Sequence, residues 1–222
     1  MPAELDCQIP RIEPAKSAEP SNQCENPQRH FNDNVHRLAA LIEATHIIPA
    51  VRTPEFVTRS ARAPGKAVSL LFGNPEHIAE IVEVVAAARK VPMVNLDLTA
   101  GFSRDEAAIS YLAHRQVQGI ISTHIEPLRA ARDFGLFAIK RTFLLDSAAI
   151  ESGLRSLKIF LPDALEVMPA IAAPRILPRL RQLYPQLPVI GGGLVTTLRE
   201  VDDLVQQGVT SVSVSDSRLW VA

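Results

Sequence analysis

Short apolar runs alternate with amphipathic stretches along most of the chain. Eight of these runs have the length and the β-rich composition of buried strands: residues 47–51, 67–72, 92–98, 119–123, 137–143, 164–168, 188–190 and 210–215. Helical periodicity lies between most of them, as in residues 76–89 and 198–207. This alternation predicts an α/β fold built from βα units.

Helix boundaries follow from capping residues. A first helix is predicted from Asn32, with Val35, Leu38 and Ile42 on one face, positioned to plug the bottom of a barrel. Ser103 is the predicted cap of the helix that ends near His114. Further caps are predicted at Asp146 or Ser147 and at Thr196 or Thr197, and a helix interrupted by Pro174 and Pro178 is predicted to end near Tyr184.

Eight strands joined by helices favour a closed parallel sheet. We predict a single-domain (β/α)8 TIM barrel over residues 32–222, preceded by a flexible, proline-rich N-terminal extension over residues 1–31. A doubly wound open sheet is the alternative, but it would normally carry its glycine loop after the first strand rather than the seventh. After the last strand there is room for no more than a short turn, in which Trp220 is expected to pack against the barrel.

A glycine loop follows the seventh strand. Gly191, Gly192 and Gly193 precede the predicted helix of residues 198–207, and the eighth strand follows directly. Glycine lets backbone N–H groups approach an anion, and a helix N-terminus adds partial positive charge. The loops after strands seven and eight form the usual phosphate site of this barrel, so phosphate binding without a dedicated lysine is predicted. A glycine turn for close helix packing is the structural alternative.

Composition narrows the functional classes. The 222 residues are 47% hydrophobic, enough for one core, and the net charge of −1 gives no overall attraction to nucleic acid. Both cysteines, Cys7 and Cys24, fall in the N-terminal extension and match no zinc ligand set, so no metal site is expected. Free thiols are expected, with a disulfide that closes the extension as the alternative. No apolar run approaches the roughly 18 residues of a membrane span, which predicts a cytoplasmic protein.

Polar residues at the predicted strand ends are the candidates for chemistry. They are Arg52, Asp97, Ser122, Thr123, His124, Lys140, Arg141 and Glu166. Alternation along a strand places Asp97 on the same face as Asn95, and Glu166 on the same face as Met168. Any one of these carboxylates could instead form a structural ion pair. Lys140 suggests a Schiff-base aldolase, although adjacent Arg141 competes for the inward direction.

Two clusters of basic residues are candidates for RNA contact. One is Arg52, Arg59, Arg62 and Lys66, and the other is Arg175, Arg179 and Arg181 with Tyr184. Either cluster can equally be an ordinary solvated surface, and aromatic residues are just 5% of the chain.

Six segments stand in a characteristic order along the chain: VNLDLTAG (94–101), GIISTH (119–124), KRTFLLDS (140–147), ALEVMPA (164–170), IGGGLVTT (190–197) and VSVSDSRLW (212–220). Together they resemble the glycerol-3-phosphate-responsive antiterminator family. The resemblance implies a TIM-barrel regulatory protein, with no catalysis and no cofactor. It implies that the protein binds glycerol 3-phosphate and then the leader mRNA of glycerol-utilisation genes, so that transcription passes a terminator.

The resemblance also implies a ligand site. Phosphate would lie on Gly191, Gly192, Gly193, Ser215, Asp216 and Ser217, while Asp97, Arg141 and Glu166 would face the glycerol end, where a carboxylate accepts hydrogen bonds from a diol. The chain departs from the pattern at His124, where an arginine is typical, and at Ala170, where a glycine is usual.

Two other functions stay open from the residues alone. One is a barrel enzyme that acts on a small phosphorylated polyol or sugar, with Lys140, Asp97 and Glu166 at the mouth. The other is a metabolite sensor that regulates a partner protein, consistent with the near-neutral charge. The sequence leaves assembly as a homo-oligomer open.

Overall fold

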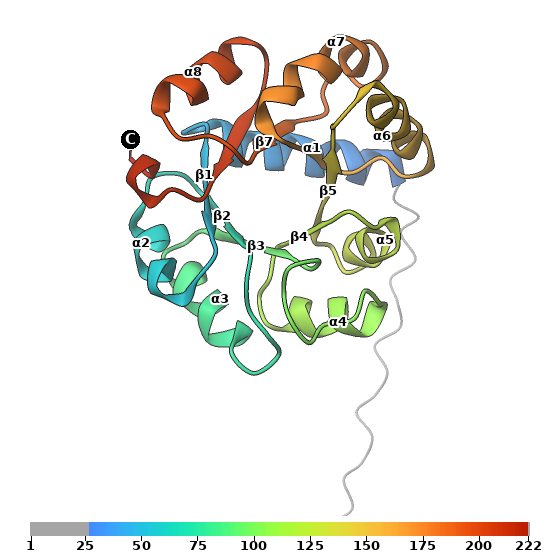
Figure 1. Cartoon of the computed structure of the whole chain (residues 1–222). Helices are drawn as coiled ribbons and strands as arrows, with labels where there is room; N and C mark the ends of the chain where they lie inside the picture. The colour runs from blue at the N-terminus through green and yellow to red at the C-terminus, as the bar shows by residue number, and fades with distance from the viewer. Residues whose placement is uncertain (1–26, 222) are drawn as a thin grey trace, which may run out of the picture.

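Eight parallel strands close into a barrel in the computed structural model, which describes residues 27–221. In chain order they are β1 (Ile47–Val51), β2 (Ala67–Leu70), β3 (Val91–Asn95), β4 (Gly119–Ser122), β5 (Phe137–Phe143), β6 (Ala164–Met168), β7 (Val189–Gly192) and β8 (Ser211–Val214). Each strand pairs with its sequence neighbours, and β8 pairs with β1. The predicted TIM barrel is confirmed (Figure 1).

Helices surround the strands as an outer ring (Figure 1). The crossovers contain α2 (Val57–Arg62), α3 (Ile78–Ala87), α4 (Glu106–His114), α5 (Ile125–Asp133), α6 (Ser147–Ile159), α7 (Ala173–Leu183) and α8 (Leu198–Gln206). Short 3-10 turns add η1 (Pro54–Phe56), η2 (Ala170–Ala172) and η3 (Ser217–Leu219). Asp105, rather than the predicted Ser103, caps α4 because its side chain accepts the N–H of Ala108.

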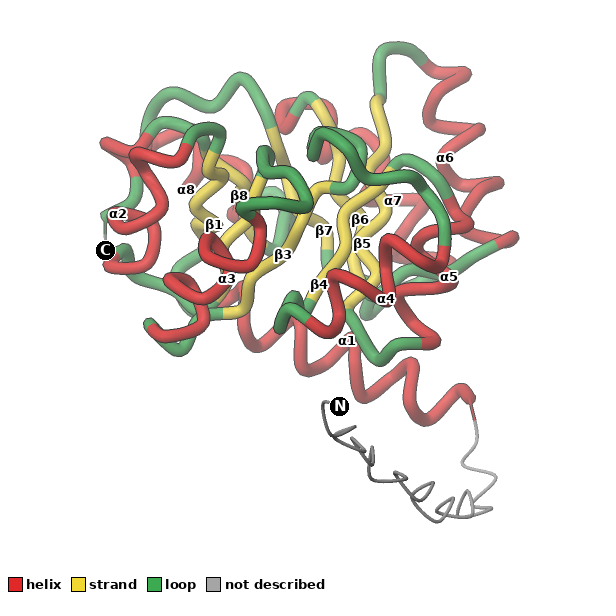
Figure 2. The backbone as a smooth tube through the Cα atoms, turned by 90° about the horizontal axis from the view of Figure 1, so that it is seen from below, coloured by secondary structure: helices red, strands yellow, loops and turns green. Residues whose placement is uncertain are grey.

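The helix α1 (Pro27–Glu43) closes the N-terminal end of the barrel. It begins five residues before the predicted start at Asn32 and lies across one end of the strands (Figure 2). Leu38 and Ile42 of α1 are buried with the inward residues Ile48 and Ile139. The predicted plug is therefore present. Cys7 and Cys24, and most of the predicted extension, lie outside the described residues.

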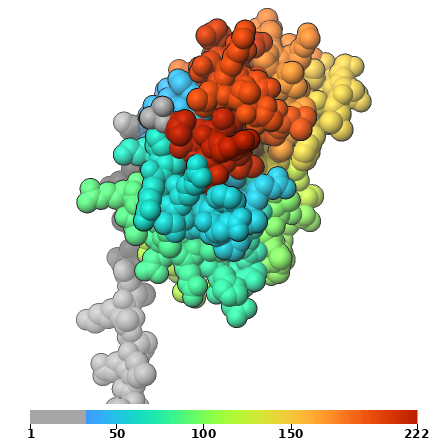
Figure 3. Space-filling view, turned by 60° about the vertical axis from the view of Figure 1, so that its left-hand side comes forward, coloured from blue at the N-terminus to red at the C-terminus, as the bar shows by residue number. Residues whose placement is uncertain are grey.

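The chain end packs where the barrel closes. Trp220 is buried, its ring meets Phe56 edge to face at 6.2 Å, and its indole N–H donates to the carbonyl of Val214. Figure 3 shows this C-terminal segment against the residues that follow β1. The expected packing of Trp220 is confirmed.

Five strands end at other residues than predicted, and the differences at β3 and β7 affect the candidate site. β3 stops at Asn95 because the N–H groups of Leu98 and Thr99 turn back to its carbonyl, so Asp97 lies in a turn and does not share a strand face with Asn95 as predicted. β7 continues through Gly191 and Gly192, which pair with β8, so the glycine loop begins at Gly193.

Candidate functional site

A cavity of about 220 Å³ opens at the carboxyl ends of the strands. Its lining comes from seven of the eight βα units: Ala50, Arg52, Leu71, Leu98, Arg141, Phe143, Glu166, Met168, Gly192, Gly193, Ser213 and Ser215. This end of the barrel is where TIM-barrel proteins bind their ligands. The lining carries two arginines and one glutamate, so the cavity has one net positive charge in a chain whose net charge is −1.

The strand register explains which side chains meet inside the barrel. In an eight-stranded barrel of this type, residues at one level shift by about one position from strand to strand, and alternate strands point inward. The register therefore places Ala50, Asn95, Arg141 and Gly192 in one layer, with Ser69, Ile121, Glu166 and Ser213 in the layer below. The small Ala50 and Gly192 leave space above the lower layer, and Glu166 and Ser213 of that layer line the cavity.

Arg141 and Glu166 form a buried ion pair on the neighbouring strands β5 and β6. Arg141 Nε donates to Glu166 Oε2 at 2.7 Å, and the two side chains are 7% and 2% exposed. The two residues are direct partners in the strand register. Both were predicted at the glycerol end, and the structure brings them together in the cavity.

Gly191, Gly192 and Gly193 are each glycine for a different structural reason. A Cβ on Gly192 would lie 3.3 Å from Glu166 Oε1, so this glycine makes room for the carboxylate. A Cβ on Gly191 would meet Ala170 at 3.1 Å, a packing contact outside the cavity lining. Gly193 has φ +77°, a conformation that favours glycine. Gly192 and Gly193 therefore line the cavity, whereas Gly191 serves close packing.

Acidic side chains already accept hydrogen bonds at the start of α8 and in the loop after β8. Glu200 Oε2 accepts from the backbone N–H groups of Thr196 and Thr197 at 2.8 and 2.9 Å, completing a capping box at the start of α8. These hydrogen bonds hold the pKa of Glu200 below its usual value, so the carboxylate is charged at neutral pH. The sequence Thr197-x-x-Glu200 is readable as this motif and could have revealed it.

The loop after β8 is similar. The carboxylate of Asp216 accepts hydrogen bonds from the side chain and the backbone N–H of Arg218, which lower the pKa of Asp216 to about 2. Ser215 lines the cavity, but Asp216 and Ser217 are not part of its lining. Backbone groups alone were predicted to balance the phosphate charge. In the structure, both loops already contain a carboxylate.

Asp97 holds two loops together. One oxygen accepts from the Ser122 hydroxyl and from Arg104 Nε, and the other accepts from the N–H and the hydroxyl of Thr123. Burial raises the pKa of Asp97, but these hydrogen bonds outweigh it and the pKa falls below its usual value. Asp97 is not part of the cavity lining, unlike Arg141 and Glu166.

Lys140 points away from the cavity. On β5, Ile139 belongs to the cluster inside the barrel and Ala138 to the cluster beneath the helices, so Lys140 faces outward. Its amine donates to the Thr123 carbonyl at 2.6 Å, and burial lowers its pKa. Arg141 takes the inward direction, whereas the sequence left open which of the two residues does so.

The first predicted basic cluster is not one compact patch, and two arginines of the second are engaged within the chain. Arg52 lies at the carboxyl end of β1, whereas Lys66 precedes β2 at the opposite end of the barrel. On α7, Arg179 pairs with Glu151 and Arg181 donates to the carbonyls of Pro185 and Leu187. His124 is the N-cap residue of α5 rather than a base in the cavity.

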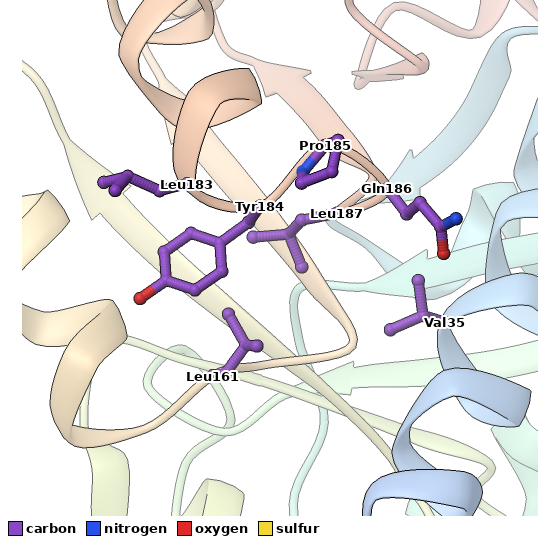
Figure 4. A pocket seen from close by; sticks show the side chains of 7 residues that line it. All are labelled: Val35, Leu161, Leu183, Tyr184, Pro185, Gln186 and Leu187. Atoms are coloured by element: carbon purple, nitrogen blue, oxygen red, sulfur yellow. The ribbon is translucent and has the colours of Figure 1, made fainter.

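A second cavity lies at the N-terminal end, between α1 and the turn after α7 (Figure 4). Val35, Leu161, Leu183, Tyr184, Pro185, Gln186 and Leu187 line it. Its side chains carry no charge, and in TIM barrels this end serves stability. The described residues also contain no cluster of three or more potential metal ligands and no helix long and apolar enough to span a membrane.

Sequence reasoning left several cavity residues without a role. Leu71, Leu98 and Phe143 line it from loops or strand ends, and Ser213 from β8. The alternation of Ser211, Ser213 and Ser215 in the last strand was the signal for the serines. The loop residues Leu71 and Leu98 lie beyond their strands, where alternation no longer indicates direction.

This chain is similar to known proteins in sequence and in fold. Residues 47–220 match the family model of the glycerol-3-phosphate responsive antiterminators. A glycerol uptake operon antiterminator regulatory protein from Listeria monocytogenes is 28% identical, with a TM-score of 0.72 over 78% of this chain and 94% of that one. A related protein from Thermotoga maritima is 26% identical, with a TM-score of 0.71 over 78% of this chain and 96% of that one.

Two further proteins are similar to this chain, one in sequence and one in fold. The Escherichia coli protein YgcP, described as uncharacterized, is 29% identical over 82% of this chain and 95% of its own length. An aldolase structure is 12% identical, covers 78% of this chain and 91% of its own, and has a TM-score of 0.62. That likeness shows the barrel fold alone.

Proposed function

The chain belongs to the glycerol-3-phosphate responsive antiterminator family, and from that membership we propose that it is a regulator that binds glycerol 3-phosphate in the cavity at the barrel mouth. The observation that carries the proposal is the buried Arg141–Glu166 pair beside Gly192, Gly193 and Ser215 in one positively charged cavity. A small anionic polyol ester fits this combination of charge and hydrogen-bonding groups.

The polyol end belongs near Glu166. The carboxylate is an acceptor of hydrogen bonds, so it suits a hydroxyl group, and the guanidinium of Arg141 offers donors beyond the one used by Glu166. Asp97, predicted for the same end, has both oxygens engaged by Ser122, Thr123 and Arg104. We therefore propose that Asp97 shapes the mouth by fixing the loops that follow β3 and β4.

The phosphate end belongs to the β7 and β8 side of the mouth. Gly193 and Ser215 lie there at the cavity edge. Of the six residues predicted to hold phosphate, Gly192, Gly193 and Ser215 face the cavity. Asp216 and Gly191 act beside it, through the Arg218 pair and through packing on Ala170.

We further propose that the ligand-bound protein binds the leader mRNA of glycerol-utilisation genes in the cytoplasm and prevents termination. Phe143 supports an RNA contact at the mouth, because it lines the cavity and is 50% exposed. An exposed aromatic ring can stack on an unpaired base, and this one also touches the ligand space. Leu145, Ile171 and Leu194, on the neighbouring loops, expose a further apolar rim.

The test is binding of a terminator-containing leader RNA with and without glycerol 3-phosphate. The ligand should tighten RNA binding, and the RNA should tighten ligand binding by the same factor. Phe143→Leu should weaken RNA binding, whereas Phe134→Leu, a partly exposed phenylalanine at the opposite end of the barrel, should not. Equal RNA binding with and without ligand would contradict the proposal.

A further inference from the structure

Resting on the proposed function, we propose that Arg52 is the residue that binds the phosphate group of the ligand. The cavity lining has three charged side chains. Arg141 and Glu166 bind each other, whereas Arg52 has no hydrogen bond or ion pair with any described residue. A free guanidinium at the edge of a small cavity is a ready partner for an anion.

The position of Arg52 follows from the closure of the barrel. Arg52 comes directly after β1, and β1 pairs with β8, with Pro49 opposite Val214. The residues just beyond these two strand ends, Arg52 and Ser215, therefore lie on the same side of the mouth, and both line the cavity. Arg52 thus belongs to the phosphate side and not to the side of Arg141 and Glu166.

Several other positive groups on that side already have acidic partners within the chain. The backbone N–H groups of Thr196 and Thr197, just before α8, donate to Glu200, and Arg218 is paired with Asp216. Arg59 acts on Asp216 as well. A phosphate dianion placed beside two capping carboxylates needs a cation of its own, and Arg52 supplies it.

Guanidinium chemistry suits this role. The planar fork of an arginine binds two phosphate oxygens at once, with stronger hydrogen bonds than a neutral donor gives. The site then has two separable halves: Arg52 with Gly193 and Ser215 for the phosphate, and Arg141 with Glu166 for the polyol. Ligand fragments should distinguish the two halves.

The experiment is calorimetric titration of the full chain with glycerol 3-phosphate and, separately, with inorganic phosphate. Arg52→Gln should weaken binding of both by about 10- to 100-fold, the usual value of hydrogen bonds to a charged group. Arg52→Lys should lose less, because the charge remains while the fork is lost. Arg62→Gln on α2 is the matched control, an exposed arginine outside the cavity, and should bind like the wild type.

Glu166→Gln completes the design, since it should weaken binding of glycerol 3-phosphate while sparing inorganic phosphate. The intrinsic fluorescence of Trp220, the one tryptophan of the chain, reports that each variant is folded. Wild type that fails to bind glycerol 3-phosphate overturns the proposed function. Wild type that binds it while Arg52→Gln binds equally well overturns the role of Arg52 and leaves the proposed function standing.

Discussion

Arg141 and Glu166 are register partners on β5 and β6 that join through a 2.7 Å hydrogen bond inside the barrel. Glu166 lies in the lower layer, at the level of Ser69 and Ser213, and Arg141 lies in the layer above it. A charged floor costs desolvation energy that an apolar layer would not. This cost is consistent with the proposal that the pair serves ligand recognition rather than stability.

Removing one partner should destabilise the fold. Glu166→Ala leaves a buried guanidinium without its counter-ion, and we expect the free energy of unfolding in urea to fall by about 3–5 kcal/mol. The double variant Arg141→Met with Glu166→Leu removes both charges and should recover much of that loss. A double variant as unstable as the single one would contradict the view of the pair as a net cost.

Asp97 should give stability that depends on pH. Its folded-state pKa is lowered, so its stabilisation is present above the unfolded-state pKa of about 3.9 and is lost as pH falls through the lower folded-state value. We expect Asp97→Asn to lower the free energy of unfolding at pH 7 by about 1–3 kcal/mol, because Ser122 and Thr123 lose a charged acceptor.

Urea unfolding at several pH values tests this. The gap between Asp97→Asn and wild type should be constant from pH 7 to about pH 5 and should shrink in more acidic solution. Asp133→Asn, the exchange of an aspartate at the end of α5, serves as a control on an acidic residue outside this network. A gap that stays the same down to the lowest pH would show that the charge of Asp97 is not what matters.

The barrel was predictable because each strand is a short apolar run between polar segments. The predicted strands 47–51, 137–143 and 164–168 have the observed bounds, since all three are buried along most of their length. The predicted strand 92–98 was too long because its apolar pattern continues into a turn. The hydrogen bonds of Leu98 and Thr99 to Asn95 end the strand there, and periodicity does not show them.

The candidate site was predictable in part. Arg141 and Glu166 follow from alternation along neighbouring strands, which also sends Lys140 outward. The roles of Asp97 and Glu200 depend on which backbone N–H groups their carboxylates reach, and this is decided by loop geometry. Arg52 was among the strand-end candidates, but the sequence did not show that it has no hydrogen bond or ion pair with the described residues.

The capping box of α8 can be tested apart from ligand binding. Thr197→Ala removes the side-chain acceptor of the Glu200 N–H, and the loss of such a cap costs about 1 kcal/mol of stability. Because Glu200 rather than a ligand occupies this helix start, we expect the affinity for glycerol 3-phosphate to stay unchanged. Urea unfolding and calorimetry on the same protein measure the two quantities, and a large fall in affinity would instead place the phosphate at the start of α8.

The enzyme alternative makes a different demand on Lys140. A Schiff-base aldolase needs an amine that reaches a carbonyl substrate in the cavity, whereas the Lys140 amine lies outside the barrel on the carbonyl of Thr123. We therefore expect no covalent adduct when the protein is treated with dihydroxyacetone phosphate or glyceraldehyde 3-phosphate and then with borohydride. Mass spectrometry of the intact chain gives the measurement, and an authentic aldolase treated in parallel shows that trapping works. A reduced adduct on Lys140 would require this side chain to turn into the barrel. It would favour the enzyme hypothesis over the proposal that the protein is a regulator.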